Sequence, residues 1–270
     1  MDTPLTGSWS LILGASSGMG RATSLALAAA GSNIIGVHLD RAHRQPEVDE
    51  LVRKIEEYGV AAHLLNENAA SDPGRARLLA AVRDLAGGTG IRVFLHSLAF
   101  GALAPFLPPV RPDDGEPPAI ATRAQLEMTL SVMAHSLVYW VQDLVREDLL
   151  PAGAKVFAMT SATTRRVSPT YGMVLAAKRA LESHIRQLAV DLAPRGVSVN
   201  AIRAGVTLTD SFLRIPESGD LRQRALARHP HGRLTTPEDV AEAILLLAQA
   251  RSSWLTGNII GVDGGEDFTM

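Results

Sequence analysis

Cysteine is absent from the 270-residue sequence, and aromatic residues make up only 4% of it. Without cysteine the chain can form no disulfide bond, offer no thiolate to a metal ion and use no cysteine nucleophile. The sequence carries no sign of an oxidising compartment, so we expect the protein to be cytoplasmic. With only three tyrosines, each can be examined individually as a candidate catalytic residue.

Charge of one sign and long apolar runs are also lacking. The 26 Lys and Arg residues nearly balance the 28 Asp and Glu residues, giving a formal net charge of -2. This balance argues against nucleic acid or an anionic membrane as a partner. No apolar run reaches the roughly 18 residues of a membrane helix. The eight histidines include no His-x3-His pair, so we predict no metal.

Short apolar segments alternate with helix-forming segments along most of the chain. The pattern opens with a strand over 8–13, a glycine turn and a helix over 21–30, and a long helix is expected over 123–149. Such alternation predicts an α/β fold, a single domain over 1–270 with a Rossmann-type doubly wound parallel sheet and helices on both faces. Ligands bind such sheets at the carboxyl ends of the strands, so the stretch at about 207–230 is a candidate substrate lid.

The glycine turn after the first strand is a candidate phosphate-binding site. Gly14, Gly18 and Gly20 let backbone N–H groups approach a pyrophosphate at a helix start, where the helix dipole also favours negative charge. A tight corner between a strand and a helix would explain the same glycines without a ligand. The coenzyme contacts expected here come from Gly14, Ser16, Ser17, Gly18, Met19 and Gly20.

The charged turn after the second strand bears on the choice of coenzyme. It reads His38, Leu39, Asp40 and Arg41. An acidic residue here accepts hydrogen bonds from the adenosine 2′-OH of NADH, whereas an arginine accommodates the 2′-phosphate of NADPH. Asp40 comes later in the chain than expected for a strict NADH site, and Arg41 and Arg44 could reach a phosphate. NADPH is therefore favoured, while NADH stays open. A solvated, charged turn is the alternative interpretation.

Tyr171 begins a predicted helix over 171–192, seven residues before Lys178. Seven residues make nearly two helical turns, so both side chains lie on one face. An ammonium group on that face can hold ribose hydroxyls and lower the pKa of the phenol, which makes the tyrosine a better proton donor. The alternative is a tyrosine packed on a loop and an unrelated surface lysine.

Several motifs together resemble the short-chain dehydrogenase/reductase family over essentially the whole chain. They are the glycine turn, Ser161 seventeen residues before Lys178, the runs 199–202 and 204–209, and Val262 to Gly265. The resemblance implies a nicotinamide-dependent oxidoreductase. In most of the family the catalytic tyrosine lies four residues before the lysine, and here that position holds Val174.

Two features resemble the bacterial enoyl-acyl-carrier-protein reductases of this family. They are the seven-residue spacing of Tyr171 and Lys178 and the run His96 to Phe100. The stretches 209–216 and 229–233 further resemble the NADPH-using variant found in some Bacillus species. A tyrosine three residues nearer the helix start moves its hydroxyl by about 4.5 Å. That suits an enoyl reductase, which delivers hydride to the β-carbon and stabilises an oxygen farther away.

The resemblance implies roles for further residues. Ser161 is a candidate catalytic residue, although a strand-end hydroxyl with a structural role is nearly as good an interpretation. Additional coenzyme contacts fall on Asn68, Ala69, Ser97, Leu98, Ala99, Lys178, Gly205, Val206, Thr207 and Thr209. Substrate contacts fall on Ala99, Phe100, Gly101, Tyr171 and Phe212.

Some residues depart from the family pattern. Met133 stands where an assisting asparagine is usual, Arg203 stands where a small residue is usual, and 105–118 is rich in proline. The resemblance also implies a homotetramer and an acyl thioester substrate on acyl carrier protein or coenzyme A. Carbonyl reduction or alcohol oxidation within the same family is the main alternative function. A nucleotide-binding regulator without catalytic activity is a third.

Overall fold

The computed structural model describes residues 5–108, 119–161 and 167–269, and the statements below concern these ranges. Seven strands form one sheet in the order β3-β2-β1-β4-β5-β6-β7, with every paired neighbour parallel. The strands are β1 (Trp9–Leu13), β2 (Asn33–His38), β3 (Ala62–Asn66), β4 (Ile91–His96), β5 (Lys155–Ser161), β6 (Ser198–Ala204) and β7 (Ile259–Val262).

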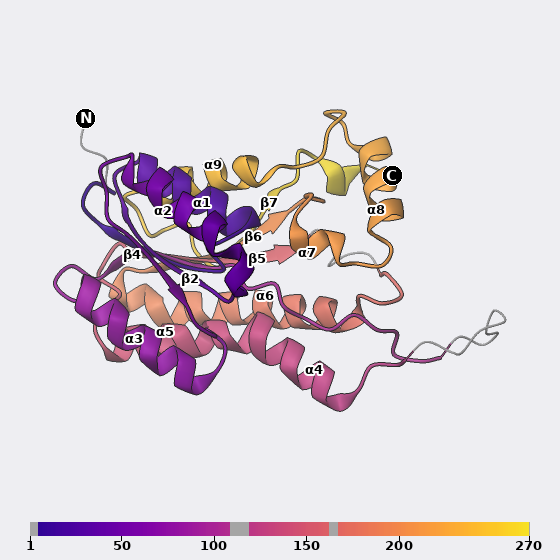
Figure 1. The fold of residues 1–270 in the computed structure, drawn as a ribbon, viewed down its shortest axis with the longest axis horizontal. Coiled ribbons are helices and arrows are strands. Elements are labelled where there is room, and N and C mark those ends of the chain that lie inside the picture. The colour runs from indigo at the N-terminus through magenta and orange to yellow at the C-terminus, as the bar shows by residue number, and fades with distance from the viewer. Residues whose placement is uncertain (1–4, 109–118, 162–166, 270) are drawn as a thin grey trace.

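Helices cover both faces of the sheet, which confirms the predicted α/β, doubly wound arrangement (Figure 1). One face carries α1 (Gly18–Ala29), α2 (Gln45–Glu56) and α9 (Pro237–Ala248). The other carries α3 (Asp72–Ala86), α4 (Arg123–Leu130), α5 (Ser136–Arg146) and α6 (Gly172–Leu192). Two short helices, α7 (Asp210–Leu213) and α8 (Ser218–Arg228), lie beyond the carboxyl ends of β5 to β7.

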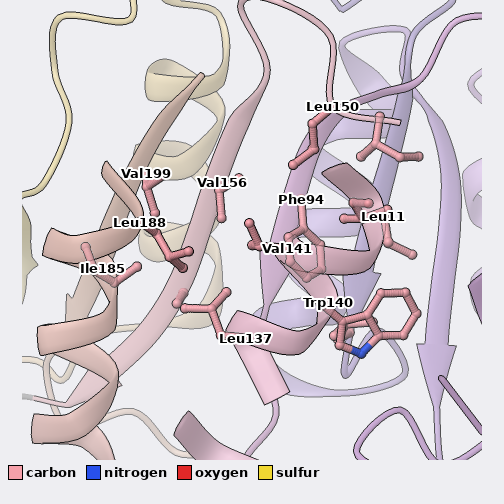
Figure 2. Packing of buried hydrophobic residues seen from close by; sticks show 14 of the residues in the cluster. Leu11, Phe94, Leu137, Trp140, Val141, Leu150, Val156, Ile185, Leu188 and Val199 are labelled. Carbon is pink, nitrogen blue, oxygen red and sulfur yellow. The ribbon is translucent and has the colours of Figure 1, made fainter. Parts of the chain in front are cut away.

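The larger core lies between the sheet and the α5 and α6 helices. Figure 2 shows Phe94, Val156 and Val199 from the strands facing side chains of α5 and α6. Because both faces of the sheet are covered, its central strands are nearly continuous apolar runs. Trp140 of α5 is fully buried, and its indole N–H donates to the Ala69 carbonyl at 2.8 Å. That bond ties α5 to the loop after β3.

Two expected segments differ in detail. The helix expected over 123–149 is divided into α4, a π-helical turn (Ser131–His135) and α5, and it ends at Arg146. It stops there because Asp148 adopts a left-handed backbone (φ 54°), which a helix cannot continue through. Within 207–230, the structure forms α7 and α8. The proline-rich segment is described only up to 108 and from 119.

The chain order creates a switch point at the carboxyl ends of β1 and β4. From β1 the chain runs outward through β2 to β3 and then returns to place β4 on the other side of β1. Connections therefore leave these two strands in opposite directions, which opens a crevice for ligands in sheets of this kind. Among the described helices, none combines the length and the apolar character needed to cross a membrane.

Candidate active site

The glycine turn lies at this switch point, between the carboxyl ends of β1 and β4. A Cβ atom on Gly14 (φ 85°) would lie 2.6 Å from the Ser97 carbonyl oxygen, and one on Gly20 would lie 2.0 Å from the Gly14 carbonyl oxygen. Side chains are therefore excluded from both positions. Ser17 caps α1 without a side-chain hydrogen bond, and the first turn holds no acidic residue. This positive helix start fits a pyrophosphate group.

The turn after β2 is held by polar contacts of Asp40. Its carboxylate lies 3.0 Å from Nδ1 of the buried His38. Burial lowers the pKa of His38, although Asp40 opposes that shift. The Asn66 side chain closes the turn, accepting from the Asp40 N–H at 3.3 Å and donating to the Asp40 carbonyl at 3.0 Å. Leu39 and Arg41 point outward and are exposed.

Lys178 brings a buried ammonium group to the carboxyl end of β5. Its Nζ donates to the Met159 carbonyl at 2.7 Å. Burial lowers the pKa of Lys178 to about 8, while the charge of Glu182 acts to raise it. Glu182, one turn farther along α6, is itself buried and accepts from Thr160 Oγ1 at 2.9 Å. Lys178 therefore stays largely protonated at neutral pH in a fixed position.

His96 lies at the end of β4, fully buried. The Ser136 hydroxyl donates to the Val132 carbonyl in the π-helical turn at 2.8 Å, so it accepts from His96 Nε2–H at 2.7 Å. Burial, together with the charge of Lys178, lowers the pKa of His96 to about 3. Nδ1 has no hydrogen-bond partner within the described residues. His96 is therefore a neutral group beside the Lys178 charge.

Tyr171 occupies the N-cap position of α6, and its partly buried side chain packs on the larger core. Phe106 lies against the same helix start, since a Cβ on Gly172 would come within 2.7 Å of the Phe106 ring. The preceding residue, Thr170, donates its hydroxyl to the Glu217 carboxylate at 3.0 Å. A contact thus joins the residue before Tyr171 to the segment that leads into α8.

Residue 174, in the first turn of α6, is part of the hydrophobic core. Val174 and Met133 are both buried, and both approach Gly101 in the loop after β4. A Cβ on Gly101 would lie 2.8 Å from Met133 Sδ and 3.0 Å from a Val174 methyl. The two positions that would hold a tyrosine and an asparagine in most of the resembling family therefore form one apolar contact here.

The segment after β6 passes next to the glycine turn. Thr209 caps α7, accepting from the Phe212 N–H at 3.2 Å, and its methyl group would lie 3.2 Å from a Cβ on Gly18. The Thr207 hydroxyl donates to the Gly205 carbonyl at 3.0 Å. This arrangement places the start of the expected lid over the expected pyrophosphate site.

The structure brings most of the predicted residues to one edge of the sheet. The residues at or against the carboxyl ends of β1, β4, β5 and β6 are those of the glycine turn, Ser97, Lys178, Ser161 and Thr209. Phe100, 60% exposed, and Ala99 follow β4 at the surface, whereas Phe212 is half-buried in α7. At Ala69 the backbone carbonyl is already used by Trp140.

Sequence reasoning missed Glu266. This buried carboxylate accepts from the Val206 N–H at 2.9 Å, and its other oxygen lies 3.7 Å from Arg228 of α8. It therefore holds the segment expected to meet the coenzyme. Arg203 lies 3.3 Å from the Asp267 carboxylate, so this departure from the family pattern ties β6 to the last residues described. The acidic residues that follow Gly264-Gly265 were the signal available in the sequence.

Comparison with known proteins assigns the family. The family model described as enoyl-(acyl carrier protein) reductase matches residues 14–267. The chain belongs to the short-chain dehydrogenase/reductase family. The relatives of this dehydrogenase/reductase include L-xylulose reductase of Bos taurus, 27% identical over 98% of each chain. Another is 1-cyclohexenylcarbonyl-CoA reductase of Streptomyces collinus, 29% identical over 95% of this chain and 85% of the relative.

A solved structure shares the fold. It is a short-chain dehydrogenase from Burkholderia cenocepacia J2315 in complex with NADP, with a TM-score of 0.82 and 23% identity, covering 97% of this chain and 99% of that one. The chain therefore shares this fold over almost its whole length, and membership of the family makes the protein an oxidoreductase. Within the described residues, no three His, Asp or Glu side chains lie together as metal ligands would.

Proposed function

We propose that this dehydrogenase/reductase is an NAD(P)H-dependent reductase of trans-2-enoyl thioesters, carried on acyl carrier protein or coenzyme A. NADPH is the favoured coenzyme. The coenzyme would lie across the glycine turn, between the turn after β2 and the segment 205–209. Substrate would enter beside Ala99, Phe100 and Gly101, and the segment 207–230 would act as its lid.

The position of Tyr171 at the start of the helix that carries Lys178 supports this reaction. Tyr171 lies at the start of α6, whereas position 174 holds a valine packed against Met133 and Gly101. A hydroxyl at 174 would stand beside the carbon that receives hydride in a ketone. Tyr171 stands about 4.5 Å farther along the helix axis, because each residue of a helix advances about 1.5 Å. That displacement suits the oxygen of a conjugated thioester.

The chemistry divides between the coenzyme and the side chains. When bound, NAD(P)H would supply the hydride for the β-carbon, and the double-bond electrons would move toward the thioester oxygen. The Tyr171 hydroxyl donates a hydrogen bond to this oxygen as negative charge develops. Lys178, charged and buried, would hold the ribose and would favour the polarised phenol. A proton taken up from solvent then adds to the α-carbon, and the hydride and the proton together complete a two-electron reduction. Ser161 is a second donor near the same oxygen.

Carbonyl reduction is the second candidate, and the relatives support both reactions. L-xylulose reductase is named for a ketose, whereas 1-cyclohexenylcarbonyl-CoA reductase is named for an unsaturated acyl thioester. The absence of a hydroxyl at Val174 favours reduction of the unsaturated thioester. A homotetramer, in which α4, α5 and α6 of neighbouring subunits pack together, completes the proposal.

Replacing Tyr171 tests the proposal directly. With trans-2-butenoyl-CoA and NADPH, we expect Tyr171→Phe to lower kcat/KM at least 100-fold, the usual scale for loss of an acid group. Tyr58→Phe, an exposed tyrosine on the α2 side, is the matched control and should behave as wild type. A fully active Tyr171→Phe protein would show that another group stabilises the thioester oxygen, and a wild-type protein that reduces only acetoacetyl-CoA would contradict the proposed reaction.

A further inference from the structure

An ion pair crosses from the turn after β2 to the lid. Arg44 Nη1 lies 2.7 Å from the carboxylate of Asp210, although the two residues are 166 positions apart in the chain. The other guanidinium nitrogen, Nη2, lies 2.6 Å from Glu47. Two carboxylates therefore surround the one arginine. Only Asp210 comes from outside the β2–α2 region.

The location of this pair matters for the coenzyme. Arg44 ends the short turn that begins α2, on the side where the adenosine ribose is proposed to bind. Asp210 directly follows Thr209, whose methyl group faces Gly18 across the glycine turn. The lid therefore enters over the proposed pyrophosphate site and places a carboxylate on the arginine that a 2′-phosphate would use.

We propose that Asp210 is a coenzyme-specificity residue. Its carboxylate occupies the Arg44 guanidinium and competes with the 2′-phosphate of NADPH, so the preference for NADPH over NADH is smaller than Arg44 alone would give. NADH carries a hydroxyl at this position and gains nothing from a free guanidinium. The inference rests on the proposed coenzyme site, but it is independent of which substrate is reduced.

Dissociation constants of both coenzymes test this role without any substrate. They can be obtained by titrating the quenching of intrinsic tryptophan fluorescence with NADPH or NADH at low ionic strength. Asp210→Asn should tighten NADPH roughly fivefold, the scale of one charge interaction near a protein surface, and leave NADH within twofold. Asp220→Asn is the matched control, since it removes one exposed lid carboxylate, whereas the carboxylates that pair with Arg44 are those of Asp210 and Glu47. It should leave both constants within twofold.

A double-mutant cycle assigns the effect to the ion pair. Arg44→Gln should weaken NADPH, and adding Asp210→Asn to it should change nothing further. Three results would overturn this inference and leave the proposed function standing. They are equal changes for both coenzymes, a weaker NADPH complex in Asp210→Asn, and an effect that persists without Arg44. Binding of neither coenzyme to the wild-type protein would overturn the proposed function together with it.

Discussion

At the scale of single residues, the candidate site depends on groups whose charge is set by burial. Lys178 and His96 are both buried near the carboxyl ends of β4 and β5, and the charge of Lys178 adds to the cost of protonating His96. His96 stays neutral because its pKa is lowered to about 3, whereas the charge of Glu182 helps Lys178 to keep its proton. Of these two groups, Lys178 therefore carries the positive charge near neutral pH.

Activity should follow the protonation of Lys178. Since burial lowers its pKa to about 8, the positive charge is present below that pH and is lost as the pH rises through it. We expect kcat/KM for the coenzyme, which reports groups of the free enzyme, to be constant from pH 6 to 7 and to fall tenfold per pH unit well above 8. The Lys178→Arg variant keeps its positive charge at high pH. The activity that this variant retains should therefore not fall over the same pH range. A flat profile to pH 9.5 in the wild type would contradict this assignment.

At the scale of elements, the loop after β4 is fixed between two helices. Gly101 leaves no room for a side chain, because Met133 of the π-helical turn and Val174 of α6 both close on it. The sequence indicated unusual residues at 133 and 174, but their meeting depends on how the π-helical turn approaches α6. Spacing along one helix carries no information about such a contact.

Gly101→Ala tests this contact. The added methyl group would lie 2.8 Å from Met133 Sδ, so we expect a loss of about 1–3 kcal/mol in the free energy of unfolding, measured in urea. Combining it with Met133→Ala should cost less than the sum of the two single changes. Gly219→Ala, where a Cβ meets nothing within 4 Å, is the control and should cost nothing. Additive losses would show that the two side chains do not compete for the same space.

At the scale of the whole molecule, parallel strand order gathers distant segments at one edge. The sequence predicted this sheet and the glycine turn, because each is a local pattern or a family motif, and the joint role of Tyr171 and Lys178 stays a prediction. It did not predict the Arg44–Asp210 pair, the Thr170–Glu217 bond or the Glu266 contact with Val206. These polar contacts join segments far apart in the chain, and their partners look like ordinary surface charges until the fold is known.

The central claim concerns which bond the protein reduces. The most direct measurement supplies trans-2-butenoyl-CoA and acetoacetyl-CoA at equal concentration with limiting NADPH and identifies the products by mass spectrometry. The product ratio equals the ratio of the two kcat/KM values. The displaced tyrosine predicts butanoyl-CoA in more than tenfold excess over 3-hydroxybutanoyl-CoA. An excess of the hydroxy product would make the protein a carbonyl reductase and contradict the role given to Tyr171.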